Sequence, residues 1–225
     1  DIFDIQSGTW SVHSLTSASN DYFTVIHGTK VAFLSRDLLS SIDVFDTSNQ
    51  TWTEFYLRTP RTDFTHISAG GIIFIACGVS LDPLTFTRSL EAYDLSTLQF
   101  AFERNLSDAR ASPVAAVSYP YVVFACGSRN GFPVSAIDVY NMQDNSLRQT
   151  IFRRPELVGS DFGIASVGNT MYIRYNNYLW MLRLHTLELT QPLATPFMAG
   201  GNNFAIGNNL VFYGQSDFLD IFYFW

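Results

Sequence analysis

Apolar and polar positions alternate in a pattern that recurs along the chain and predicts short β-hairpins. In IDVFDTSNQTW, from Ile42 to Trp52, an alternating run ends at Phe45-Asp46, a polar turn follows, and Trp52 begins a returning run. Asp and Ser favour tight turns, and alternate side chains of a strand point to opposite faces, so this stretch predicts a hairpin. The same arrangement recurs at Phe3-Asp4 with Trp10 and Tyr93-Asp94 with Phe100, and more weakly at Tyr140-Asn141 with Leu147 and Leu182-Arg183 with Leu189.

A second pattern lies between these hairpins: a short strand ending in small residues, a Gly-centred turn, and then a strongly apolar strand. Its copies are YFTVIHGTKVAFL, FTHISAGGIIFIACG, SPVAAVSYPYVVFACG, FGIASVGNTMYIRY and NFAIGNNLVFYG. Together with a hairpin, each copy gives a unit of roughly 40 to 50 residues that contains four short strands. No segment has the 3.6-residue period of an amphipathic helix.

These units predict an all-β protein with one domain over residues 1–225. A single four-stranded sheet cannot bury both of its faces, so the units must pack side by side, and twisted sheets packed radially close into a β-propeller. The expected innermost strands begin near Tyr22, Phe64, Pro113, Phe162 and Asn203. We therefore expect four-stranded antiparallel blades, about five of them. The alternative is a portion of a six- or seven-bladed ring.

The repeat resembles that of the Kelch-repeat β-propellers over essentially the whole chain. The likeness lies in Arg61 and His66 before AGGIIFIACG, in the spacing from Asp46 to Trp52, and in the strand ends of small residues followed by glycine at Gly78, Gly127 and Gly214. Two features depart from that family. Its double glycine is mostly reduced to one, and Phe100, Leu147 and Leu189 replace the Trp. A divergent WD-type or other propeller is the alternative.

Composition and charge exclude several classes of partner. The chain of 225 residues is 47% hydrophobic, carries a formal net charge of −7, and has Lys30 as its one lysine. A broad cationic surface for nucleic acid or anionic lipid is therefore not expected, and no apolar run reaches the ~18 residues of a membrane span. The start lacks the features of a signal peptide, which fits a mature product or a segment of a longer chain. Two sequons, at Asn49 and Asn105, are possible glycosylation sites and favour an extracellular or cell-surface location over the cytoplasm.

Alignment of the units brings several polar residues to one predicted mouth of the propeller. Asp21, Asp63, Ser112, Asp161 and Gly200 precede the innermost strands, and Arg61 and Arg110 are equivalent to each other. Arginine forms bidentate contacts with carboxylates, so this mouth could hold an acidic peptide or a polar glycan. The alternative is that each Asp caps its own turn and each Arg braces adjacent blades. The candidate partner-binding residues are Arg58, Arg61, Asp63, Arg110, Arg154 and Asp161.

The sequence predicts no catalytic residue, metal ligand or cofactor. The four histidines fall at different places in their units, so they do not form a ligand cluster. Cys77 and Cys126 occupy the same place in adjacent units and are expected to be buried free thiols that pack as small hydrophobic groups.

We therefore expect a non-catalytic interaction module that binds a protein or glycan partner through loops at one mouth of the propeller. An acidic partner would suit the arginines of that mouth. One alternative is a structural segment of a secreted or cell-surface assembly. The other is a propeller-type lectin or glycan hydrolase.

Overall fold

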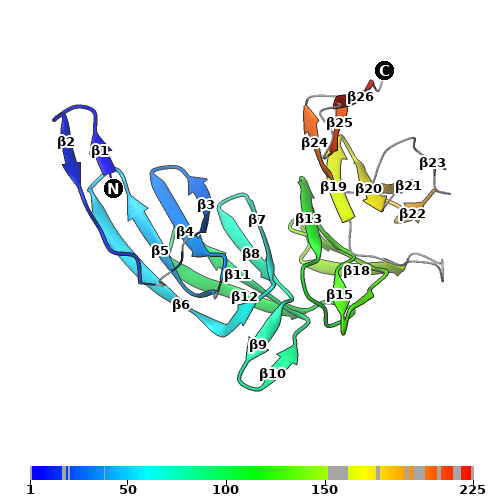
Figure 1. The fold of residues 1–225 in the computed structure, drawn as a ribbon, viewed down its shortest axis with the longest axis horizontal. Coiled ribbons are helices and arrows are strands. Elements are labelled where there is room, and N and C mark those ends of the chain that lie inside the picture. The colour runs from blue at the N-terminus through cyan, green and yellow to red at the C-terminus, as the bar shows by residue number, and fades with distance from the viewer. Residues whose placement is uncertain are drawn as a thin grey trace.

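The structure is a computed structural model, and it forms an open arc of antiparallel β-sheets (Figure 1). It describes residues 2–16, 19, 21–37, 39–151, 162–175, 178–190, 193–194, 201–206, 209–214 and 219–223, the last three segments in their backbone alone. The N-terminal hairpin lies at one end of the arc and the C-terminal strands at the other (Figure 1). The described part of the chain contains strands, turns and bends and no helix, which confirms the all-β prediction.

Four sheets of similar construction make up most of the arc. The first contains β3 (Tyr22–His27), β4 (Lys30–Ser35), β5 (Leu39–Asp46) and β6 (Thr51–Thr62). The second contains β7 (Thr65–Ala69), β8 (Ile72–Ala76), β11 (Ser89–Asp94) and β12 (Gln99–Asn105). The third contains β13 (Val114–Ser118), β14 (Tyr121–Ala125), β17 (Ala136–Asn141) and β18 (Ser146–Ile151). The fourth contains β19 (Phe162–Val167), β20 (Thr170–Tyr175), β21 (Tyr178–Arg183) and β22 (Glu188–Leu189), and β23 (Leu193–Ala194) also pairs with β21.

Shorter elements lie at the two ends of the arc and between the main strands. The N-terminal hairpin is β1 (Ile2–Asp4) with β2 (Thr9–Ser11), and the C-terminal sheet is β24 (Gly201–Ile206), β25 (Asn209–Gly214) and β26 (Leu219–Tyr223). Two further hairpins leave the second and third sheets: β9 (Val79–Leu81) with β10 (Leu84–Phe86), and β15 (Ser128–Arg129) with β16 (Phe132–Pro133). The β9–β10 hairpin extends the first sheet because β9 pairs with β6.

The first strand of each sheet lies beside the first strand of the next, on the concave side of the arc (Figure 1). β7 contacts β13, β13 contacts β19, and β19 contacts β24, while Phe23 on β3 packs against His66 on β7. This is the side-by-side packing that the repeats predict. The sheets do not close into a ring, so the predicted closed ring is not seen in this structure.

The hydrophobic core lies between successive sheets. Val44, Ile73 and Ile75 are among the buried residues between the first and second sheets, and equivalent clusters fill the next two spaces. The second strands β8 and β14 are almost completely buried because neighbouring sheets cover both of their faces, which explains why their sequences are apolar without alternation. Trp52, at the outer edge of the first sheet, is half-buried and packs on Phe45.

The recurring aromatic-Asp pair forms the turn between the third and fourth strands. An oxygen of Asp4, Asp46, Asp94 or Asn141 accepts a hydrogen bond from the N–H two residues later. Four residues after each of these positions, and after Arg183, φ is positive, between 56° and 66°, at Gly8, Gln50, Leu98, Asn145 and Leu187. The left-handed residue reverses the chain, so that the aromatic pairs directly with the residue seven positions later, as Phe45 does with Trp52.

The Cys-Gly pairs at the ends of β8 and β14 occupy a tight backbone crossing. Gly78 and Gly127 have φ of 100° and 97°, and an added Cβ would lie 2.4 Å from the Thr62 carbonyl oxygen or 2.6 Å from that of Ala111. These distances leave no room for a side chain. The chain entering a sheet therefore passes directly over the end of that sheet's second strand.

We predict that Gly127→Ala destabilises the protein much more than Gly168→Ala does. Both glycines have positive φ, which costs about 1–2 kcal/mol for an L-residue. A Cβ added at Gly168 would meet no atom within 4 Å, whereas one added at Gly127 would overlap with Ala111. Urea denaturation should give a loss of about 1 kcal/mol at Gly168 and at least twice that at Gly127. Equal losses would contradict the close crossing.

Candidate partner-binding end of the sheets

The candidate site is the end of the sheets where each chain segment enters the next sheet, which we call the connection end. Here β6 continues toward β7, β12 toward β13, and the β9–β10 and β15–β16 hairpins project. The elements are joined by backbone hydrogen bonds: Thr62 pairs with Val79, Ala111 with Ser128, and the Ser112 N–H donates to the Asp63 carbonyl at 2.6 Å. Asp63 and Ser112 are equivalent exposed residues with φ of 49° and 47°.

Arg61 lies at this end but is completely buried, with 0% of its surface exposed. Its guanidinium forms an ion pair with Glu91 on β11, which is also 0% exposed. It further donates to the carbonyl oxygens of Cys77 at 3.2 Å and Thr59 at 2.9 Å. These contacts connect the incoming segment to the second and third strands of the second sheet.

Arg110 repeats this arrangement in the third sheet. It too is 0% exposed, and its Nη2 atom lies 2.7 Å from Oδ2 of Asp138 on β17. It also donates to the carbonyl oxygens of Phe124 at 3.3 Å and Asp108 at 3.1 Å. The predicted equivalence of Arg61 and Arg110 therefore extends to their contacts.

The buried carboxylates also hold the backbone of the incoming segments. Glu91 accepts the Arg58 N–H at 3.2 Å, and Asp138 accepts the Ser107 N–H at 2.8 Å. In the first sheet, Asp43 accepts the N–H of Thr16 at 3.0 Å and its hydroxyl at 2.8 Å. Three successive sheets thus use an acid at the same position of the third strand to fix the chain entering the sheet.

This geometry corrects the proposed role of Arg61 and Arg110. Both guanidinium groups are inaccessible to a partner because carboxylate and carbonyl oxygens surround them inside the protein. The bracing alternative describes their contacts. Of the other candidates, Asp63 is exposed, Arg58 is exposed with its guanidinium 3.9 Å from the centre of the Phe100 ring, and Arg154 and Asp161 lie outside the described residues.

Two exposed arginines that the sequence reasoning missed lie at the connection end. Arg36 forms an ion pair of 2.5 Å with Asp21, and Arg129 forms one of 2.6 Å with Asp108, with side-chain exposures from 36% to 57%. Arg36 follows β4 at the place where the next two sheets have Gly78 and Gly127. That departure from the repeat was the available sequence signal.

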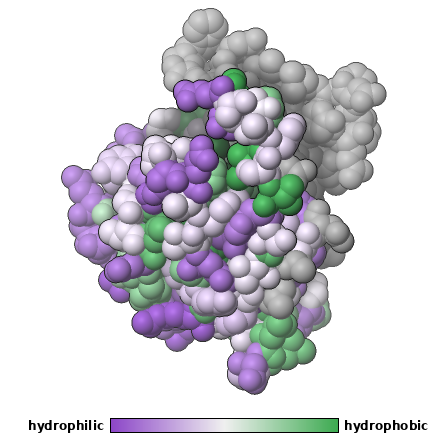
Figure 2. Space-filling view, turned by 90° about the vertical axis from the view of Figure 1, so that its left-hand side faces the viewer, coloured by the Kyte–Doolittle hydropathy of each residue, from purple (hydrophilic) through white to green (hydrophobic). Residues whose placement is uncertain are grey.

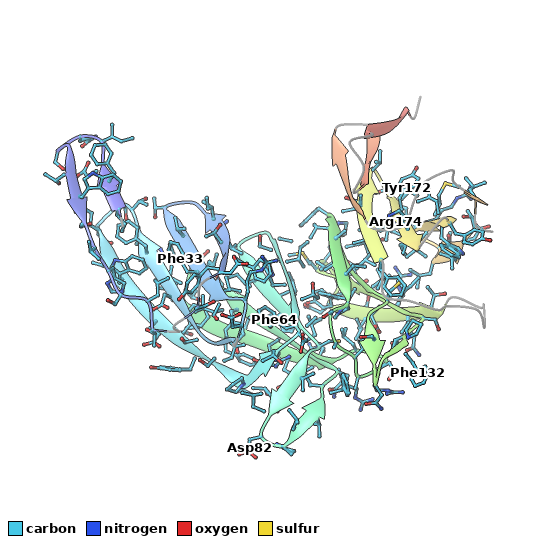
Figure 3. All side chains as sticks on the ribbon, viewed as in Figure 1. Phe33, Phe64, Asp82, Phe132, Tyr172 and Arg174 are labelled. Carbon is cyan, nitrogen blue, oxygen red and sulfur yellow. The ribbon has the colours of Figure 1, made fainter. Side chains whose placement is uncertain are left out.

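The two projecting hairpins add apolar groups to the connection end. Leu84 and Phe132 are each 74% exposed and Leu81 is 46% exposed. Asp82, at the tip of β9–β10, and Phe132, on β15–β16, project on the same side of the molecule (Figure 3). A groove of about 420 Å³ lies along β15–β16 and is lined by the Arg129–Asp108 pair and Phe132. The surface thus combines ion pairs with apolar tips.

His66 lies on the concave side near the exposed Arg36–Asp21 pair. Its ring centre is 4.0 Å from that of Phe23, and the Arg36 guanidinium lies 4.3 Å from the centre of the same Phe23 ring. Burial, with a smaller contribution from the positive charge of Arg36, lowers the pKa of His66 to about 4. The neutral imidazole is therefore the form that the folded protein prefers.

The cysteine thiols are buried, and the described His, Cys, Asp and Glu side chains do not gather into a metal site. Cys77 and Cys126 are buried free thiols, as predicted, and burial raises the pKa of Cys77 to about 11. Within the described ranges, no cluster of three or more His, Cys, Asp or Glu side chains could hold a metal ion. None of the described segments is a helix that is long and apolar enough to cross a membrane.

The asparagines of the two sequons are both exposed: Asn49 lies in the turn between β5 and β6, and Asn105 is the last residue of β12.

Comparisons with known proteins support the fold. No family model and no curated protein matches the chain. Among solved structures, 839 chains match. One of them, titled "Structure of YjhT", gives a TM-score of 0.62 at 12% sequence identity over 86% of this chain and 73% of that chain. This likeness shows a β-rich fold that is compatible with a propeller-like arrangement of antiparallel sheets.

We predict that removing one partner of a buried ion pair strongly destabilises the protein. Arg110→Met leaves the Asp138 charge buried without its cation and should cost about 3–5 kcal/mol of unfolding free energy. Adding Asp138→Asn removes that charge and should recover part of the loss, so a double-mutant cycle will be non-additive. Chemical denaturation of the four proteins measures this. A single-variant loss below about 0.5 kcal/mol would contradict the bracing role.

We predict that His66 makes the stability sensitive to acid. The pKa is about 4 in the folded protein and about 6.5 in the unfolded chain, so the unfolded chain binds the proton first as the pH falls. Above pH 6.5 the imidazole is neutral in both states and does not change the free energy of unfolding. As the pH falls toward 4, protonation of the unfolded chain lowers that free energy by up to about 3 kcal/mol. Urea denaturation between pH 7 and 4 should show a steeper loss for the native protein than for His66→Phe. Parallel curves would contradict this assignment.

Proposed function

We propose that the chain is a Kelch-type β-propeller segment that acts as a non-catalytic interaction module. Support comes from the repeated four-stranded units, the first strands lined along one concave side, and the fold match. We propose that each four-stranded sheet is one blade. A rigid scaffold of this kind limits the entropy lost when its loops bind.

The connection end is the proposed binding surface, and the partner is a protein or a glycan. The observation that carries this proposal is the combination of exposed Arg36 and Arg129 pairs with the exposed tips at Leu84 and Phe132. Buried Glu91 and Asp138 fix the two incoming segments, and the β9–β10 and β15–β16 hairpins pair with these segments at Thr62 and Ala111, which favours a preformed surface. An acidic partner would exchange the carboxylates of Asp21 and Asp108 for its own.

A second candidate function is a structural segment of a secreted or cell-surface assembly. The exposure of Asn49 and Asn105, both in sequons, favours it because N-linked glycans attach to accessible asparagines of secreted proteins. A shift in mass after glycosidase treatment of protein from a secreting eukaryotic host would support this candidate.

We predict that Arg36→Glu with Arg129→Glu weakens binding to an acidic ligand at least tenfold without lowering the melting temperature by more than about 2 °C. Reversed charges repel the ligand, and both side chains are exposed. Arrays of acidic peptides and of neutral and acidic glycans provide the ligands. The matched control is Arg183→Glu, whose exposed pair with Glu188 lies at the opposite end of its sheet. Equal binding by all variants would refute this surface.

A further inference from the structure

A groove of about 750 Å³ lies beside the first sheet, away from the connection end. One wall is the β1–β2 hairpin and the other is formed by β5, β6 and the turn between them. This volume falls within the range of roughly 300–1,000 Å³ that is typical of small-molecule sites. Figure 2 shows the side of the molecule that carries this hairpin, where hydrophobic and hydrophilic residues are interspersed.

Aromatic rings form the apolar part of the groove. Trp52 has the Phe45 ring centre at 5.0 Å, and the His13 ring stacks on it at 4.0 Å with an angle of 7° between the planes. Phe3 adds an aromatic surface from the opposite wall and is 47% exposed. The His13 ring covers one face of Trp52, so the exposed aromatic groups of the groove are His13 and Phe3. Exposed aromatic rings of this kind bind the apolar faces of ring-shaped ligands.

Hydroxyl and amide groups form the polar part of the groove. Thr9, Ser11, Thr47 and Gln50 all line it. Each of these side chains can both donate and accept hydrogen bonds. Thr9 already shares a hydrogen bond with Ser7, and the Thr47 hydroxyl donates to the Thr29 carbonyl. Each group keeps further hydrogen-bonding capacity, which a ligand carrying hydroxyl or amide groups of its own would use and an apolar ligand would not.

The groove offers little charge to a ligand. Apart from Asp4 and His13, none of the described side chains that line it can carry a charge. Asp4 accepts the N–H of Gln6 at 2.8 Å and that of Ser7 at 3.3 Å, and these hydrogen bonds lower its pKa. The Asp4 carboxylate is therefore ionised and already satisfied by its own turn. An anionic ligand would be repelled, and no lining Lys or Arg would attract it.

From these observations we propose that the groove binds a neutral saccharide. The aromatic rings would contact the C–H faces of the sugar rings, and the hydroxyl and amide side chains would exchange hydrogen bonds with the sugar hydroxyls. This site is distinct from the connection end and does not depend on the function proposed there.

The test is isothermal titration calorimetry of the full chain with maltotriose, cellotriose and triacetylchitotriose, with saturation-transfer NMR to identify contacting groups. At least one trisaccharide should bind, and Trp52→Leu should weaken that binding at least tenfold. Trp52 also packs within the sheet, so Phe3→Ala and Gln50→Ala, which alter groups at the groove surface, serve as second variants and should each weaken binding at least threefold. Tyr119→Ala, at a residue 72% exposed elsewhere, is the control and should leave binding unchanged.

Binding that is lost in the groove variants and kept in the control supports the proposal. Three outcomes overturn it: none of the three trisaccharides binds, their binding does not depend on the groove residues, or the groove takes up an apolar peptide or a hydrophobic dye and rejects the sugars. If the groove binds no saccharide, the proposed binding surface at the connection end is unaffected, because the Arg36 and Arg129 variants test it with acidic ligands.

Discussion

A buried carboxylate on the third strand is the interaction that fixes the order of these sheets. Asp43, Glu91 and Asp138 each accept a backbone N–H from the segment that enters their sheet. An incoming segment passes from one sheet to the next, and its N–H groups need acceptors there because a buried N–H without one costs about 1–3 kcal/mol. The Arg58 N–H has a second acceptor in the Tyr93 hydroxyl. The carboxylate satisfies the segment and at the same time determines where it crosses.

The arginines follow from this constraint. Once Glu91 and Asp138 are buried as anions, they require positive charge, because an isolated buried charge is strongly unfavourable. Arg61 and Arg110 supply it and also donate hydrogen bonds to carbonyl oxygens. Asp43 accepts a hydroxyl from Thr16, and the residue aligned with Arg61 is the smaller Ser19. In the first sheet the acid of the third strand is therefore held by hydrogen bonds from the uncharged Thr16, whereas in the second and third sheets it also pairs with an arginine.

Much of the architecture could be predicted from the sequence because its signals are local. The hairpin from Phe45 to Trp52 depends on an Asp turn, which is visible in the repeat, and on a left-handed residue at Gln50, for which the repeat has no common residue type. The burial of Arg61 was not local, since its partner Glu91 lies thirty residues ahead. The signal was nevertheless present: acids align three residues before Asp46, Asp94 and Asn141, and aligned arginines precede two of those sheets. An arginine and an acid that recur together in successive repeats indicate a structural pair rather than a binding site.

The same reasoning explains where binding residues are to be found in a repeat protein. Positions that successive units share are occupied by what those sheets need, such as the glycine of the second and third sheets or the acid that holds the incoming chain in the first three. A side chain that replaces a shared residue is free of that requirement and can serve a ligand. Arg36, which stands where the next two sheets need glycine, and Phe132, on a hairpin whose length differs from that of β9–β10, are of this kind. Residues that the units share are therefore assigned to the structure, and exposed residues that differ between units are the candidates for binding a ligand.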